Sequence, residues 1–109
     1  MIKILRISLH PLRASQLRAL REKYGEDIKI ISIQTPIEEE DIGNLLDSIK
    51  PDVVEAVLSL DLWEELFDEC KKRNIELIRA KMKKSKDAKG LKFEGYKRIK
   101  QFIIESEDI

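Results

Sequence analysis

The sequence is poor in several residue types that carry recognisable chemistry. Its 109 residues include one cysteine and one histidine, with only three prolines and four glycines. A single cysteine excludes an internal disulfide and a zinc site built from cysteines. That cysteine, Cys70, falls on the apolar stripe of a predicted helix in "LFDECKKR", so we expect it to be buried by packing rather than reactive.

Long apolar runs and cofactor motifs are also missing. No stretch approaches the roughly 18 apolar residues of a membrane span, and the first residues lack the cleavage site of a signal peptide. We therefore expect a cytoplasmic protein. The sequence contains no GxGxxG after its first predicted strand, no GxxxxGK[ST], no GxSxG and no His or Cys pair at metal spacing. We expect no cofactor and no metal.

Charge is what the sequence has in abundance. Charged residues make up 39% of the chain and hydrophobic residues 42%, and lysine and glutamate dominate the charged set, a pattern typical of thermophilic proteins. The net charge is zero, but residues 81–100 hold nine Lys or Arg against Asp87 and Glu94, a net of +7. The rest of the chain therefore carries −7. Positive charge gathered in one segment indicates an anionic partner.

Strand and helix patterns alternate along the chain. Short runs rich in isoleucine and valine predict four strands, at residues 2–9, 27–34, 52–59 and 75–82. Between them we predict a helix at 14–24 that ends at Gly25, and a second that begins at "TPIE" with Thr35 as its N-cap. A third begins at Ser59 or Asp61 and stops at Asn74.

The segment after residue 82 predicts two further features. We expect the lysine-rich residues 83–92 to form a mobile basic loop. The following "FEGYKRIKQFIIE" predicts an amphipathic C-terminal helix, whose apolar face would hold Tyr96, Ile99, Phe102 and Ile103.

These elements predict the fold class and the place of any ligand. Alternating strands and helices with short connections indicate one Rossmann-like α/β domain over residues 1–109, with three layers and a four-stranded, mainly parallel sheet. In such sheets ligands bind beyond the carboxyl ends of the strands. The polar, charged or aromatic residues that follow the four strands are Ser8, His10, Arg13, Gln34, Thr35, Ser59, Asp61, Trp63, Lys81, Lys83 and Lys84.

Each of these residues has a functional and a structural interpretation. His10 either acts as a general acid or base near neutral pH or only hydrogen-bonds in the turn before Pro11. Ser8 and Ser59 either bind phosphate or serve as cap and strand residues. Trp63 either stacks on a base or packs on the neighbouring loop. The lysines either contact phosphate or form a solvated surface.

Two stretches resemble a known family. "LHPLRASQLRAL" is similar to the "SHPLTxxQ" opening of small Rossmann-like CRISPR-associated accessory proteins, and "VLSLDLWEELFDECKKRNIELIRA" is similar to their third strand, helix and fourth strand. The resemblance covers residues 1–82. Here Leu9 stands between Ser8 and His10, Arg13 replaces a hydroxyl residue, and Leu60 stands where the family has proline. The family is regarded as ring nucleases, which cut cyclic oligoadenylate second messengers as homodimers.

Two hypotheses follow from these observations. The first is a homodimeric, metal-independent ring nuclease, or binder, of cyclic oligoadenylate, since cleavage by a neighbouring 2′-hydroxyl needs only alignment and charge stabilisation. His10, Ser8 and Arg13 would form its catalytic group. The remaining residues at the strand ends would bind the substrate. The second is a non-enzymatic module that binds nucleic acid or an acidic protein through the basic segment 81–100.

Overall fold

The computed structural model describes residues 1–84 and 90–101, and the side chain of residue 91 is not described. The elements are β1 (Ile2–Ile7), α1 (Ala14–Tyr24), β2 (Ile28–Ile33), α2 (Asp41–Ile49), β3 (Val53–Ala56), α3 (Leu60–Lys72), β4 (Glu76–Lys84) and β5 (Leu91–Arg98). The chain therefore has an α/β fold. Within the described ranges, no helix is both long enough and apolar enough to cross a membrane.

All five strands form one sheet in the order β2-β1-β3-β4-β5. The strands β1 to β4 are parallel to one another, and β5 runs antiparallel to β4. The prediction of a mainly parallel sheet is confirmed, but the prediction of four strands is wrong. The strand order reverses between β1 and β3, because β2 lies on one side of β1 while the later strands extend on the other.

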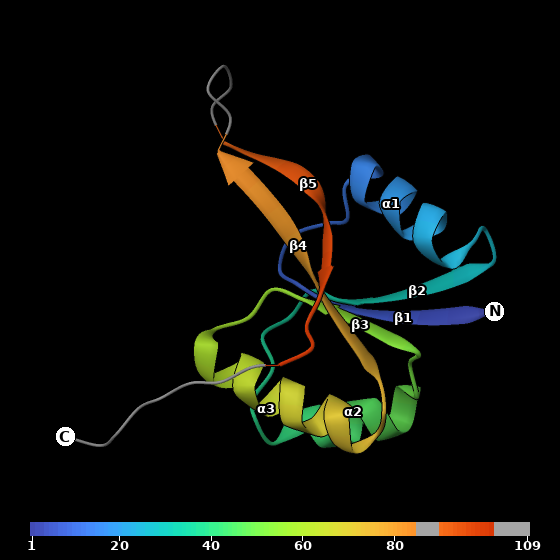
Figure 1. The fold of residues 1–109 in the computed structure, drawn as a ribbon. Helices are drawn as coiled ribbons and strands as arrows, with labels where there is room; N and C mark the ends of the chain where they lie inside the picture. Colours follow the sequence, from blue (N-terminus) through green and yellow to red (C-terminus); the bar gives the residue numbers. More distant parts are fainter. Residues whose placement is uncertain (85–89, 102–109) are drawn as a thin grey trace.

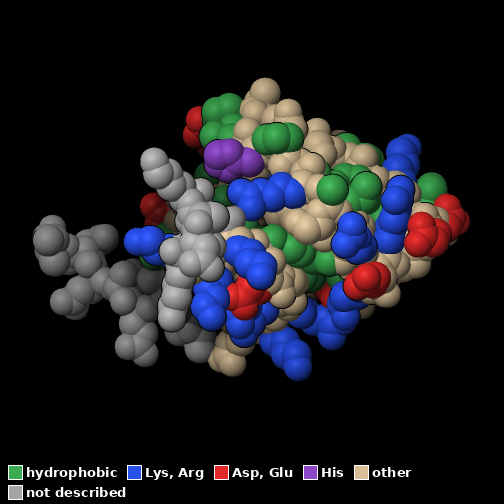
Figure 2. Space-filling view, turned by 90° about the horizontal axis from the view of Figure 1, so that it is seen from above, with side chains coloured by type: hydrophobic (Ala, Val, Ile, Leu, Met, Phe, Trp, Pro, Cys, Tyr) green, Lys and Arg blue, Asp and Glu red, His purple; other side chains and the backbone are tan. Residues whose placement is uncertain are grey.

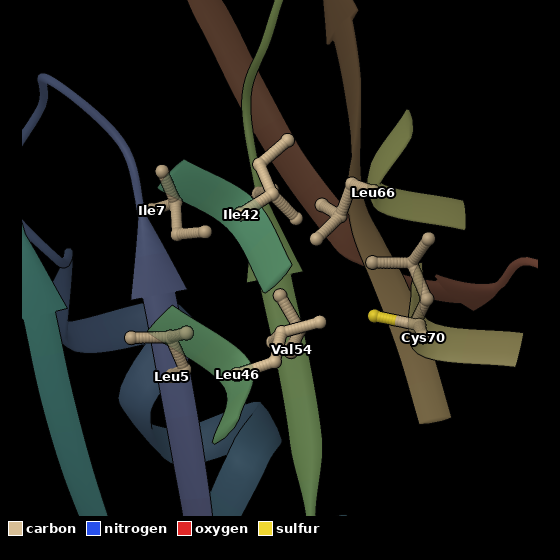
Figure 3. Close-up of a cluster of buried hydrophobic side chains, with 9 residues drawn as sticks. Leu5, Ile7, Ile42, Leu46, Val54, Leu66 and Cys70 are labelled. Carbon is tan, nitrogen blue, oxygen red and sulfur yellow. The ribbon is translucent and has the colours of Figure 1, made fainter. Parts of the chain in front are cut away.

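The helices cover both faces of this sheet, with α1 on one face and α2 and α3 on the other (Figure 1). Alternate residues of β1 therefore enter two different clusters. Leu5 and Ile7 pack with α2 and α3, whereas Ile4 packs with Leu20 of α1. Figure 3 shows the larger cluster, in which Cys70 is buried as predicted. Burial on both faces explains why the central strands read as nearly continuous apolar runs.

The first and third helices lie where the sequence predicts them. α1 spans Ala14–Tyr24 and ends at Gly25, whose φ of +94° favours glycine. α3 has Ser59 as its N-cap residue, one of the two predicted starts. The prediction for α2 is wrong, because this helix begins at Asp41 rather than just after Thr35. The Asp41 carboxylate accepts a hydrogen bond from the Glu38 backbone N–H (3.1 Å), the reciprocal contact of a capping box, so the turn that leads into α2 forms at Glu38 rather than at Thr35.

The predicted helix after residue 92 is a strand over its described part. Residues 93–98 belong to β5, while Phe102 and Ile103 lie outside the described residues. Lys81 pairs with Gly95 and Met82 with Phe93, so Glu94 is an extra residue that forms a bulge. The bulge places Phe93 and Tyr96 on one face, with ring centroids 5.0 Å apart. Phe93 and Tyr96 are three positions apart in the sequence, which is also the spacing of residues on one face of a helix.

The expected basic loop is shorter than residues 83–92. Lys83 and Lys84 continue β4, and residues 91 and 92 begin β5, because the two strands pair along this length. Residues 85–89 lie outside the described part of the chain. α1 contacts β5, and the Tyr24 hydroxyl donates a hydrogen bond to the Glu76 carboxylate (3.1 Å). Glu76 also binds Arg98 (Nε–Oε1 2.6 Å). These contacts fix α1 against the β4–β5 hairpin.

Candidate functional site

A cavity of about 780 Å³ opens at the carboxyl ends of β1 and β3. The reversal of strand order lies between these strands, and such a reversal leaves a crevice where open α/β sheets bind ligands. We call it the carboxyl-edge cavity. Its polar, charged and aromatic lining includes Arg6, Ser8, His10, Arg13, Trp63 and Arg79. Figure 2 shows the single histidine, in purple, with Lys and Arg side chains close to it on the same face.

The loop that carries His10 is held by hydrogen bonds at its start. The buried Ser8 hydroxyl accepts a hydrogen bond from the His10 backbone N–H (3.1 Å). Nη1 of Arg6 donates to the His10 carbonyl oxygen (2.5 Å). The Ser8 backbone N–H donates to the Ile33 carbonyl (3.1 Å), which ties the loop to β2. The backbone of His10 is thus fixed, while its exposed side chain faces the cavity.

The N-terminus of α1 forms another wall of the cavity. Arg13 is the N-cap residue of α1, and its backbone N–H donates to Oε1 of Gln16 (2.9 Å). Gln16 is buried, so this contact fixes the start of the helix. Both residues line the cavity. A helix N-terminus beside a cationic side chain is a favourable environment for an anion.

A buried charged cluster lies on the α1 face beside the cavity. Arg6 of β1 and Glu55 of β3 are partners in the strand register and are 2% and 1% exposed. Nε of Arg6 lies 3.3 Å from Oε2 of Glu55, an ion pair without good hydrogen-bond geometry. The Tyr96 hydroxyl of β5 is buried close enough to this carboxylate to affect its pKa, but it has no hydrogen-bond partner among the described residues. We call these three residues the Arg6–Glu55–Tyr96 cluster.

Burial is the main influence on the pKa values of Glu55 and Tyr96 in this cluster. Burial raises the pKa of the Glu55 carboxyl above its usual value, although the Arg6 guanidinium and the Tyr96 hydroxyl both favour the ionised form. Burial, with the neighbouring Glu55 charge, also raises the pKa of Tyr96. The sequence contained a signal for this cluster, because Arg6 and Glu55 each interrupt an apolar strand. We did not predict Arg6, Gln16, Glu55, Arg79 or Tyr96 as site residues.

The predicted site residues divide into three groups in the structure. Ser8, His10, Arg13 and Trp63 meet in the carboxyl-edge cavity. Thr35 and Ser59 line a smaller hollow of about 180 Å³, which Ser8 also borders. The remaining residues are exposed and line neither space; they are Gln34, Asp61, Lys81, Lys83 and Lys84. The three lysines belong to β4, whose residues Arg79, Ala80 and Met82 line the cavity instead.

The fold and the site together define an α/β protein with a cationic and aromatic cavity at the carboxyl edge of its sheet. Comparison with models of known protein families finds no match for this chain. Comparison with curated proteins finds no match either. In the described residues, no three His, Cys, Asp or Glu side chains gather as a group that could hold a metal ion.

Proposed function

We propose that this chain binds cyclic oligoadenylate in the carboxyl-edge cavity and cleaves it without a metal. One observation carries the proposal: His10, Arg13 and Trp63 converge on a single cavity at the switch in strand order. An arginine suits a phosphodiester, an aromatic ring suits a base, and a histidine suits proton transfer. The resemblance of residues 1–82 to ring nucleases supports the same substrate.

The size of the cavity supports a dimeric arrangement. A volume of about 780 Å³ suits one drug-sized ligand, which corresponds to a nucleotide rather than a ring of several. A cyclic oligoadenylate therefore extends beyond one cavity, and the cavity of a second copy would bind another nucleotide of the same ring. We propose a cytoplasmic homodimer in which each copy binds part of the ring, within type III CRISPR defence.

The proposed chemistry uses the ribose of the substrate as the nucleophile. The 2′-hydroxyl attacks the adjacent phosphorus, and the P–O5′ bond breaks with its electron pair on O5′, which takes a proton from water. The product is a linear oligonucleotide with a 2′,3′-cyclic phosphate at one end and a 5′-hydroxyl at the other. His10 orients the 2′-hydroxyl or accepts its proton. Arg13 and Arg79 offset the charge on the phosphoryl oxygens. Ser8 holds the His10 loop and borders the bound phosphate.

A turnover assay tests the proposal. The purified protein is incubated with cyclic tetra-adenylate in EDTA, and the products are separated by chromatography. We expect linear products, and we expect His10→Ala to lower turnover by about 100-fold or more, as for loss of a general acid or base. Lys29→Ala, an exposed change on the edge strand β2, serves as the control and should keep full turnover. Absence of both binding and product at micromolar protein would contradict the proposal.

A second candidate function is binding to a nucleic-acid backbone, and the charges of the β4–β5 hairpin support it. Arg79 lies directly opposite Lys97, and Lys83 lies opposite Lys92. Like charges in such positions destabilise a sheet, so an anion bound over them would stabilise the hairpin. We call the exposed side chains on this side of the hairpin the basic ribbon face; they are Arg79, Lys81, Lys83, Lys92 and Lys97. A two-stranded ribbon with this charge suits a nucleic-acid backbone.

A further inference from the structure

The Arg6–Glu55–Tyr96 cluster is the feature that the proposed function leaves unexplained. Two opposite charges are almost fully buried there, beside an exposed histidine and a cavity. A buried ion pair is often no more stabilising than apolar residues of similar volume. Buried charge next to a cavity is instead typical of functional sites. The burial of these charges beside the cavity therefore favours a role in binding a ligand.

Arg6 is placed to contact a ligand directly. Its side chain lines the carboxyl-edge cavity although it is 2% exposed. Nη1 donates to the His10 carbonyl, and Nε faces Glu55. The Nη1 contact is a hydrogen bond and the Nε contact is an ion pair without one, so a guanidinium with five N–H groups has donors left for a bound anion. A planar guanidinium matches the oxygens of a phosphate group in two-point contact.

Glu55 fixes the position of this guanidinium from the neighbouring strand. Arg6 and Glu55 are register partners on β1 and β3, so the backbone holds both side chains at a set spacing. The groups with charge or a titratable proton that face Glu55 are Arg6 from β1 and Tyr96 from β5. β4 presents Ile78 at the register position, and α1 contributes the neutral Leu20 and Gln16 on this face.

We infer that Arg6 binds a phosphodiester of the substrate at the base of the carboxyl-edge cavity, and that Glu55 is its positioning residue and takes up a proton when the phosphodiester binds. This inference rests on the proposed function for the identity of the substrate. The physical reason is that Arg6 is then shared by two anions in a buried place, where an uncompensated charge is costly. Protonation of Glu55 relieves that cost.

Proton uptake makes binding depend on pH in a definite direction. The phosphodiester is a fixed single anion, so it adds no titration of its own. If Glu55 binds a proton on complex formation, affinity rises as pH falls, by up to about tenfold per pH unit. His10 lines the same cavity, so its side chain has to be removed before a pH dependence can be assigned to Glu55. The measurement is therefore made in a His10→Ala background, where the histidine contributes nothing.

The experiment uses Trp63 as its probe. Trp63 is the only tryptophan of the chain and lines the cavity, so its fluorescence reports binding without a label. His10→Ala protein is titrated with the linear dinucleotide adenylyl-adenosine, and separately with cyclic tetra-adenylate, between about pH 5 and pH 8. We expect affinity to rise at low pH, and we expect Glu55→Gln to remove that dependence. Arg6→Gln should weaken binding by about tenfold or more.

Glu76→Gln is the matched control. Glu76 also pairs with an arginine and a tyrosine hydroxyl, Arg98 and Tyr24, but it does not line the carboxyl-edge cavity. This change should leave the pH dependence intact. If Glu55→Gln does not fold, calorimetry of the His10→Ala protein in two buffers of different ionisation enthalpy measures the proton uptake directly.

The outcomes separate this inference from the proposed function. Glu55-dependent binding of adenylyl-adenosine, without binding or cleavage of the cyclic substrate, supports the inference and overturns the proposed substrate. Cleavage of the cyclic substrate, with binding that is independent of Arg6 and of pH, overturns the inference and leaves the proposed function standing. Absence of binding of both ligands overturns both.

Discussion

At the residue scale, the proposed phosphate contact depends on two isolated polar residues of the sheet. Arg6 and Glu55 each occupy a position where a strand residue faces the core, and each is buried. The sequence shows them as interruptions of apolar runs, but it does not show that they are register partners. That pairing arises only when β1 and β3 become neighbours in space. His10 and Trp63 could be predicted as site residues, because His10 lies in the loop after β1 and Trp63 lies in the first turn of α3.

The single cysteine gives a prediction at the same scale. Cys70 is 1% exposed in the cluster beneath α3, and burial raises the pKa of its thiol to about 12. Since the thiolate is the reactive species, we expect the native thiol to be inert toward a disulfide reagent at about pH 8. Reaction should become fast on unfolding in urea. Rapid modification of the native protein would show that α3 does not bury this side chain.

At the element scale, the local sequence pattern is enough to predict α1 and α3 but not β5. Apolar spacing and a terminal glycine define α1, and Ser59 defines the start of α3. Phe93 and Tyr96 have helical spacing in the sequence, yet they lie on one face of a strand because of the bulge at Glu94. Pairing with the long strand β4 thus overrides the local pattern. The position of Tyr96 beside Glu55 could not be predicted for the same reason.

Gly95 provides the test of this bulge. Its φ is +127°, and an added Cβ would meet no heavy atom within 4 Å, so the cost of a side chain is backbone strain alone. We expect Gly95→Ala to lower the free energy of unfolding by about 1 to 3 kcal/mol, measured by urea denaturation. Ser48→Ala, an exposed change in α2, should stay within about 0.5 kcal/mol of the parent. Equal stability of the two variants would contradict the bulge geometry.

At the scale of the whole molecule, charge and topology give the described part of the chain two cationic surfaces, the carboxyl-edge cavity and the basic ribbon face, which share Arg79. The alternation of strands and helices was enough to predict that ligands meet the carboxyl edge of the sheet, and four of the predicted residues do line one cavity there. The lysines of residues 81–84 lie instead along β4, on the basic ribbon face or at its end. The sequence could not separate the two surfaces, because the separation depends on how β5 pairs.

Backbone amide shifts in nuclear magnetic resonance test the central claim, which is that the carboxyl-edge cavity holds the phosphate-bearing ligand. Nitrogen-labelled His10→Ala protein is titrated with cyclic tetra-adenylate at moderate salt. The account predicts that the largest shifts fall at Ser8, Arg13 and the indole N–H of Trp63, with small shifts at the lysines of the basic ribbon face. Shifts confined to Lys83, Lys92 and Lys97, or no shifts at all, would contradict it.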